Sequence, residues 1–182
     1  MEKNASSAGV ARGGLFHTTD IKILICYILN AIDEPVPVDM LGNVLHFEGI
    51  ANAFEVSDAV VSLANLGQIV AVDEKEQSYK ITQSGRNTAE TLKTSLSAVV
   101  KERAYLATMK MLAKFKNAKD NTFEITKENG GTYLTCSAID SGKPFISIKI
   151  LITDEDQGSY IREKFLENPA EIYSKIIEML TK

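Results

Sequence analysis

The sequence contains no apolar run of the roughly 18 residues that a membrane-spanning helix needs. Its first twenty residues also lack the apolar stretch typical of a signal peptide. Cysteine is scarce, and both Cys26 and Cys136 lie in apolar or alternating runs, where cysteine is usually buried as a small hydrophobic residue. We therefore expect a cytoplasmic protein whose two thiols do not form a disulfide.

Histidine is also scarce, and no residue pattern points strongly to catalysis. His17 and His46 have no cysteine pair or carboxylate at metal-ligand spacing, so the sequence predicts neither a metal site nor a cofactor. Asp154 and Asp156 could act as an acid and a base, but negative charge at the start of a helix explains the pair without a cleft. We expect that the protein is not an enzyme.

The composition is nevertheless that of a folded chain. Of the 182 residues, 45% are apolar and 24% are charged, with a formal net charge of −4, which is ordinary for a protein with a buried core. This length suits one large domain or two small ones. Residues 1–17 begin with a stretch rich in Ser, Ala, Gly and Asn, so we expect a mobile tail. Two domains, over 18–96 and 97–182, are expected to follow.

Helical and strand-like patterns alternate between residues 18 and 96. Apolar residues at helical spacing predict a helix that is capped by Thr19 or Asp20 and ends near Ile32. Two prolines, at positions 35 and 37, interrupt the helix. The sequence then predicts helices over 38–45 and 54–66, a hairpin of strands over 69–73 and 79–81, and a helix from 82 to 92.

Several segments of the sequence resemble known proteins. Residues 54–69, together with Tyr79-Lys80-Ile81-Thr82 and Gly85-Arg86, resemble the recognition helix, wing and closing motif of PadR-type and MarR-type bacterial transcriptional regulators. Over about 18–180 the chain is also similar to an uncharacterised family of winged-helix proteins filed as a domain of unknown function. That family ends in an Asn-x-x-x-Ile-Tyr-x-x-Ile pattern, and residues 168–176 match it.

The resemblance implies a homodimeric, DNA-binding transcriptional regulator with a winged helix-turn-helix over 18–96. Such a domain lays its third helix in the major groove of double-stranded DNA, while the wing touches phosphates. The helix over 54–66 would then read the groove, and Lys75 and Lys80 would contact phosphates. The residues expected to contact DNA are Lys22, Ser57, Asp58, Ser62, Asn65, Lys75, Lys80 and Arg86.

Positive charge is missing from the part of the chain that DNA binding would need most. Residues 23–74 contain no lysine or arginine, and their eight acidic residues are Asp33, Glu34, Asp39, Glu48, Glu55, Asp58, Asp73 and Glu74. Non-specific DNA affinity comes from lysine and arginine neutralising phosphates. A second hypothesis therefore stays open, in which the winged helix does not bind DNA and its acidic surface binds a basic protein partner.

The aromatic residues near the third helix have two possible roles. Phe47, Phe54, Tyr27 and Tyr79 could stack on bases, but they stand beside apolar helical positions. We expect them to pack in the core.

Residues 97–182 have a different periodicity. They predict a helix over 98–115, then strands over 123–126, 133–139 and 145–152 that are joined by glycine-containing turns, which indicates an antiparallel meander. Asp154-Glu155-Asp156 and Pro169 each mark the start of a terminal helix. The aromatic residues of this domain are expected to join sheet and helices in a core rather than to line an effector pocket; they are Tyr133, Phe145, Tyr160, Phe165 and Tyr173.

The predicted fold class is therefore α+β, with an N-terminal winged helix-turn-helix and a C-terminal three-stranded antiparallel meander packed with helices. The C-terminal domain would dimerise or sense a signal.

Overall fold

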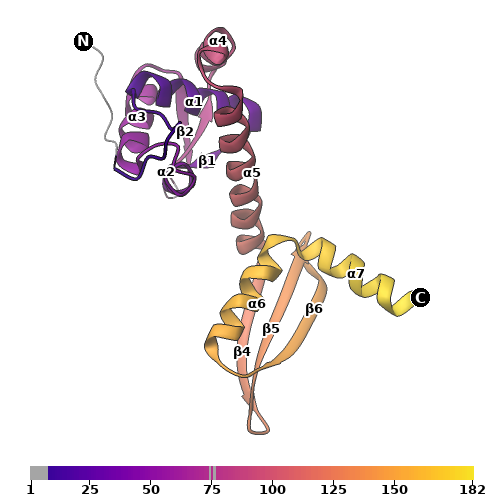
Figure 1. The fold of residues 1–182 in the computed structure, drawn as a ribbon. Helices are drawn as coiled ribbons and strands as arrows, with labels where there is room; N and C mark the ends of the chain where they lie inside the picture. Colours follow the sequence, from indigo (N-terminus) through magenta and orange to yellow (C-terminus); the bar gives the residue numbers. More distant parts are fainter. Residues whose placement is uncertain (1–7, 74, 76) are drawn as a thin grey trace. The chain divides into compact units, whose positions relative to one another are not determined.

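The computed structural model describes residues 8–73, 75 and 77–182 (Figure 1). Within these residues the chain forms seven α-helices and two three-stranded antiparallel sheets, a mixed α+β arrangement. It divides into two compact units, Met1–Leu112 and Ala113–Lys182. The boundary between the units lies inside a helix whose first part buries Val100, Ala104, Thr108 and Leu112 and belongs to the N-terminal unit.

The elements of the N-terminal unit follow the predicted order. They are α1 (Thr18–Ile32), β1 (Val36–Pro37), α2 (Val38–Phe47), α3 (Ala53–Asn65), β2 (Ile69–Asp73), β3 (Ser78–Ile81), α4 (Gln83–Leu92), the 3₁₀-helix η1 (Lys93–Ser95) and α5 (Ala98–Asp120), whose last turns belong to the second unit. The predicted strand over 69–73 is confirmed, and the other predicted elements agree within two residues except α5, which runs five residues further. The predicted cap of α1 is wrong, because Thr19 and Asp20 already lie within the helix and His17 occupies the N-cap position.

A small sheet closes the N-terminal unit, with the strand order β1-β3-β2. Val36 pairs with Tyr79, and Ile69 pairs with Ile81. The sequence did not predict β1, since a two-residue strand containing a proline has no periodicity of its own. Its pairing with β3 ties the segment before α2 to the hairpin.

The core of the N-terminal unit is formed by the buried faces of α1, α2 and α3. The predicted apolar stripe of α1 is fully buried, and so are leucines from α2 and α3. The buried residues of the three helices include Ile21, Leu24, Ile25, Ile28, Leu29, Leu41, Leu45, Val56 and Leu63. Helices α1 to α3 are therefore held by apolar packing, which is non-directional and proportional to the area removed from water.

The segment before α1 is hydrogen-bonded to the connection between α2 and α3. Residues 1–7 of the predicted tail lie outside the described residues. Further along, the Ala11 N–H donates to the Gly49 carbonyl at 2.8 Å and the Leu15 N–H donates to the Ile50 carbonyl at 2.7 Å. Leu15 is buried. Residues 11–15 are thus packed on the unit.

The second unit is the predicted antiparallel meander followed by two helices. Its elements are β4 (Asn121–Glu128), β5 (Gly131–Asp140), β6 (Lys143–Ile152), α6 (Glu155–Glu167) and α7 (Pro169–Thr181), with the strand order β4-β5-β6. Both hairpin turns have two residues with positive φ, Asn129 and Gly130 in one and Ser141 and Gly142 in the other. Such turns match the right-handed twist of the strands that they join.

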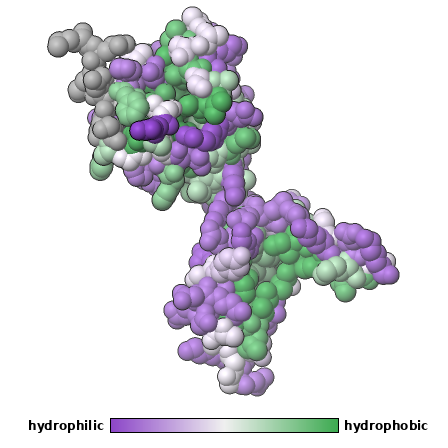
Figure 2. All heavy atoms as spheres, in the orientation of Figure 1, coloured by the Kyte–Doolittle hydropathy of each residue, from purple (hydrophilic) through white to green (hydrophobic). Residues whose placement is uncertain are grey.

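Helix α6 covers one face of this sheet. Leu134, Cys136, Ala138, Ile152 and Phe165 form the buried core between them. The α6 helix begins where the sequence predicted, with the Asp154 carboxylate accepting a hydrogen bond from the Gln157 N–H at 2.7 Å. Hydrophobic surface stays visible beside α6, over β5 and β6 (Figure 2). In the part of the chain that the structure describes, no helix has the length and apolar character to cross a membrane.

Candidate functional site

Helix α3 presents one side to the core and the other to solvent. Its first turn is capped by Asn52, whose side-chain oxygen accepts a hydrogen bond from the Phe54 N–H at 2.9 Å. Val56, Ala59, Val60 and Leu63 form the buried side. Since these positions are fixed by burial, the residues between them define the surface that α3 offers to a partner.

Two of the polar residues predicted to contact DNA are exposed on α3. Asp58 and Asn65 are exposed, whereas Ser57 and Ser62 are half-buried. The Ser57 hydroxyl donates to the Ala53 carbonyl of its own helix at 3.2 Å. Glu55, in the first turn of α3, is half-buried as well. The two serines therefore contribute less to the outer face than the sequence predicted.

Apolar side chains occupy much of the remaining outer surface. Phe54 is 83% exposed and Val61 is 58% exposed. At the end of α2, Phe47 is 84% exposed. The prediction that Phe47 and Phe54 pack in the core is wrong, because both lie outside the buried stripes of their helices. Phe54, Asp58, Val61 and Asn65 follow the spacing i, i+4, i+7 and i+11, so helical periodicity could have placed them together on the outer face.

A groove of about 300 Å³ lies between α2 and α3, beside Phe54. It is lined by Asp39, Gly42, Asn43, Ala53, Phe54 and Ser57. At Gly42 the two helices are in contact, since a Cβ added there would lie 3.6 Å from the Ala53 carbonyl oxygen, an ordinary van der Waals distance. The lining combines one aromatic ring with one carboxylate and includes no basic side chain. We call the outer face of α3 (Phe54, Asp58, Val61, Asn65) together with this groove the α3 surface.

Two of the residues predicted to contact DNA lie beside an acidic residue. Arg86 donates one hydrogen bond to the Asn30 side-chain oxygen at 3.1 Å and another to the Asp33 carboxylate. The Lys80 Nζ lies 4.0 Å from the same carboxylate. The hydrogen bond from Arg86, together with its positive charge, lowers the pKa of Asp33. Both cations therefore share an anionic partner at the C-terminal end of α1.

The other two predicted cations lie on different elements. Lys22 is half-buried in the first turns of α1. Lys75 is exposed in the turn between β2 and β3, where its backbone N–H donates to the Asp73 carboxylate at 2.8 Å. Of the four predicted cations, the structure brings Lys80 and Arg86 together at Asp33.

The aromatic residues of the second unit differ among themselves. Phe165 is buried and packs edge-on against Phe123, with ring centroids 5.9 Å apart, while Phe145 packs edge-on against Tyr173 at 5.7 Å. Tyr160 is 62% exposed and Phe145 and Tyr173 are each 40% exposed, so the predicted places of these three residues in the core are wrong. Among the described residues, no group of three or more His, Cys, Asp and Glu side chains is arranged to hold a metal ion.

Comparison with known proteins gave one result. A family model described as "Domain of unknown function (DUF4364)" matches residues 21–180, a range that includes parts of both units. No curated protein and no solved structure gave a match.

Proposed function

This chain belongs to the family described as a domain of unknown function, DUF4364, and from its own surfaces we propose that its N-terminal unit is a winged helix that binds a basic protein partner. The order helix, strand, helix, helix, strand, strand, together with the sheet order β1-β3-β2, supports the winged-helix assignment. In this assignment α3 occupies the place of the recognition helix, and the β2–β3 hairpin is the wing.

The exposed character of the α3 surface is the observation that carries this proposal. Exposed aromatic and aliphatic side chains that cluster on one face commonly mark protein interaction sites. Aromatic residues are also enriched among the anchors that supply most of the binding energy of an interface. Phe54, at 83% exposure beside a groove, is such an anchor.

Charge supports a basic partner over a phosphate backbone. The α3 surface carries the carboxylates of Asp58 and Asp39, and no lysine or arginine occurs in residues 23–74. Complementary charge steers association and suppresses wrong partners. Lys80 and Arg86, two of the cations that DNA binding would use, contact Asp33. A partner presenting lysine or arginine around an apolar segment fits this surface.

DNA binding by a transcriptional regulator is the second candidate, with the C-terminal unit dimerising or sensing a signal. The observation in its favour is the order of the elements, together with an exposed Lys75 in the β2–β3 turn, where a wing contacts phosphates. Ser57, Ser62 and Asn65 would contact base edges. Dimerisation would double the number of phosphate contacts.

Site-specific photocrosslinking tests the first candidate. p-Benzoylphenylalanine replaces Phe54 in the full chain, and irradiation is carried out in the cells that produce the protein. Val99, which is 70% exposed on α5, carries the same group in the control. We expect a discrete crosslinked protein from position 54 that is absent from position 99 and is lost when Asp58→Lys is added. Crosslinking at position 54 that does not respond to Asp58→Lys, or no discrete product, would count against this candidate.

Fluorescence polarisation tests the second candidate. The full chain is titrated into the duplex upstream of its own gene and into a scrambled duplex, from about 50 to 200 mM salt. A DNA-binding regulator gives selective binding with a steep salt dependence that Lys75→Ala reduces. The protein-binding candidate predicts no binding to either duplex even at the lowest salt concentration.

A further inference from the structure

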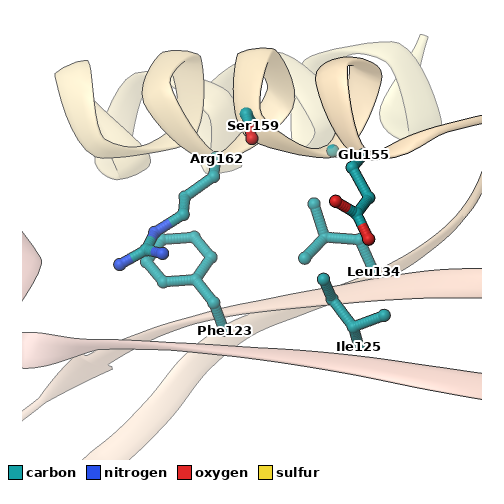
Figure 3. Close-up of a pocket in the computed structure, with 7 residues that line it drawn as sticks. Phe123, Ile125, Leu134, Glu155, Ser159 and Arg162 are labelled. Carbon is teal, nitrogen blue, oxygen red and sulfur yellow. The ribbon is translucent and has the colours of Figure 1, made fainter.

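A second groove, in the C-terminal unit, lies between α6 and strands β4 and β5 (Figure 3). Its volume is about 360 Å³, which falls in the lower part of the range for small-molecule sites. The residues that line it are Phe123, Ile125, Leu134, Glu155, Gly158, Ser159 and Arg162.

The floor of this groove is apolar and open. Ile125 stands opposite Leu134 in the β4–β5 register, and both side chains lie on the face that α6 covers. Ile125 is nevertheless 59% exposed, so the protein's own side chains leave apolar area uncovered there. On the helix side, Gly158 has no side chain to fill the space, and a Cβ there would lie 3.0 Å from Ile152 Cδ1. The floor can therefore receive an apolar body.

One wall carries a guanidinium group that is held in place by an aromatic ring. Arg162 points from α6 toward the strands, and its Cζ lies 4.8 Å from the centroid of the Phe123 ring (Figure 3). A cation–π contact of this kind favours one position of the guanidinium group while its N–H groups stay available to a carboxylate. In residues 8–73, 75 and 77–182 Arg162 has no ion-pair partner.

The opposite end of the groove is negative. Glu155 precedes Arg162 by seven residues, which corresponds to about 10 Å along a helix. Its side chain points toward Leu134 and Ile125, and Ser159 lies on the helix between the two charged residues (Figure 3). A ligand lying along this groove would meet a positive group at one end and a carboxylate at the other. The second carboxylate of a dicarboxylic acid would be repelled by Glu155.

We propose that this groove binds a small monocarboxylate with an apolar body. The ligand carboxylate accepts hydrogen bonds from Arg162 and Ser159, and its body lies on Phe123, Ile125 and Leu134. Arg162 suits this role because its planar fork matches the two carboxylate oxygens. The site is in the C-terminal unit and holds whether the α3 surface binds protein or DNA.

The test is an NMR titration of the ¹⁵N-labelled full chain with 3-phenylpropionate. We expect saturable chemical-shift changes at Phe123, Ile125 and Ser159 in the millimolar range or below. The neutral 3-phenylpropionamide should bind about tenfold more weakly or worse, because it loses the charge-assisted hydrogen bonds. The dicarboxylate 2-phenylsuccinate should also bind more weakly than 3-phenylpropionate. Shifts that are scattered over the protein, or equal affinity for acid and amide, would overturn the proposal.

Three variants assign the effect to the groove. Arg162→Gln should weaken 3-phenylpropionate binding about tenfold or more, and Ser159→Leu should abolish it by filling the space. Lys164→Gln is the matched control, since it removes the same charge from α6 at a residue that is paired with Glu167 at 3.2 Å. If Lys164→Gln weakens binding as much as Arg162→Gln does, the attraction is a general charge effect and the proposed site is wrong. Circular dichroism of each variant verifies that the fold is retained.

Discussion

Gly85 lies at the tightest contact among the helical glycines of the N-terminal unit. It is the third residue of α4, and a Cβ at this position would stand 2.1 Å from the Gln68 carbonyl oxygen and 2.6 Å from Ile81 Cδ1. The Ile81 side chain can rotate away. The Gln68 carbonyl cannot easily move, because it accepts hydrogen bonds from both the backbone N–H and the hydroxyl of Thr82, at 3.0 and 2.9 Å.

We therefore expect Gly85→Ala to destabilise the unit. Alanine is favoured over glycine inside a helix by about 1 kcal/mol. Overpacking costs about 1–3 kcal/mol, and each hydrogen bond lost as Gln68 shifts costs about 1 kcal/mol more. The net loss is about 2–4 kcal/mol, which for a unit of this size lowers the melting temperature by on the order of 10 °C.

Differential scanning calorimetry of the full chain measures this loss, with Gly158→Ala as the matched control. Gly158 is also buried within a helix, but its added Cβ would meet only the mobile end of Ile152, at 3.0 Å. The control should stay within about 1 kcal/mol of the unsubstituted chain. If Gly85→Ala melts at the same temperature as Gly158→Ala, the Gln68 carbonyl does not exclude a side chain at position 85, and the expected destabilisation is refuted.

Three further predictions concern Phe54, Asp33 and the two thiols. Phe54→Ala should change the free energy of unfolding by less than about 0.5 kcal/mol, whereas Leu63→Ala, on the buried side of the same helix, should cost about 2–5 kcal/mol in urea unfolding; similar losses would show that Phe54 is part of the core. The neighbouring guanidinium of Arg86 lowers the pKa of Asp33. The charged carboxylate therefore stabilises the folded state at pH values above its ordinary pKa of about 4, and this stabilisation is lost as the pH falls through the lowered pKa of the folded state. The stabilities of the unsubstituted chain and Asp33→Asn should therefore differ at neutral pH and converge in acid, and a difference independent of pH would contradict this. Burial raises the pKa of Cys26 to about 11 and also raises that of Cys136, so Ellman's reagent at pH 8 should react with both thiols only after unfolding, and rapid labelling of the native protein would refute the burial.

Local signals in the sequence predicted most of the secondary structure. The apolar period of α1, the turns of the meander and the capping residues Thr82 and Asp154 act over a few residues, so each can be read without the rest of the chain. The strand β1 could not be found this way. Its two residues become a strand only by pairing with β3, more than forty positions away.

The candidate site was predicted less completely, for a similar reason. The absence of cations between residues 23 and 74 is visible in the sequence. That Arg86 contacts Asp33, 53 positions earlier, depends on how α1 and α4 pack and has no local signature. The exposure of Phe47 has no local signal either, since an apolar residue beside apolar helical positions predicts burial, although much of any protein surface is apolar.

The two-residue turns of the C-terminal sheet limit how the length of the chain can vary between relatives. Because side chains alternate between the faces of a strand, one inserted residue in either hairpin would turn the following strand over and remove its apolar side chains from α6. Two inserted residues would keep the alternation, and one could be absorbed by a bulge such as the irregularity between Ala138 and Ile139. Alignment gaps at residues 129–130 or 141–142 are therefore expected in even numbers, or as single residues accompanied by a bulge.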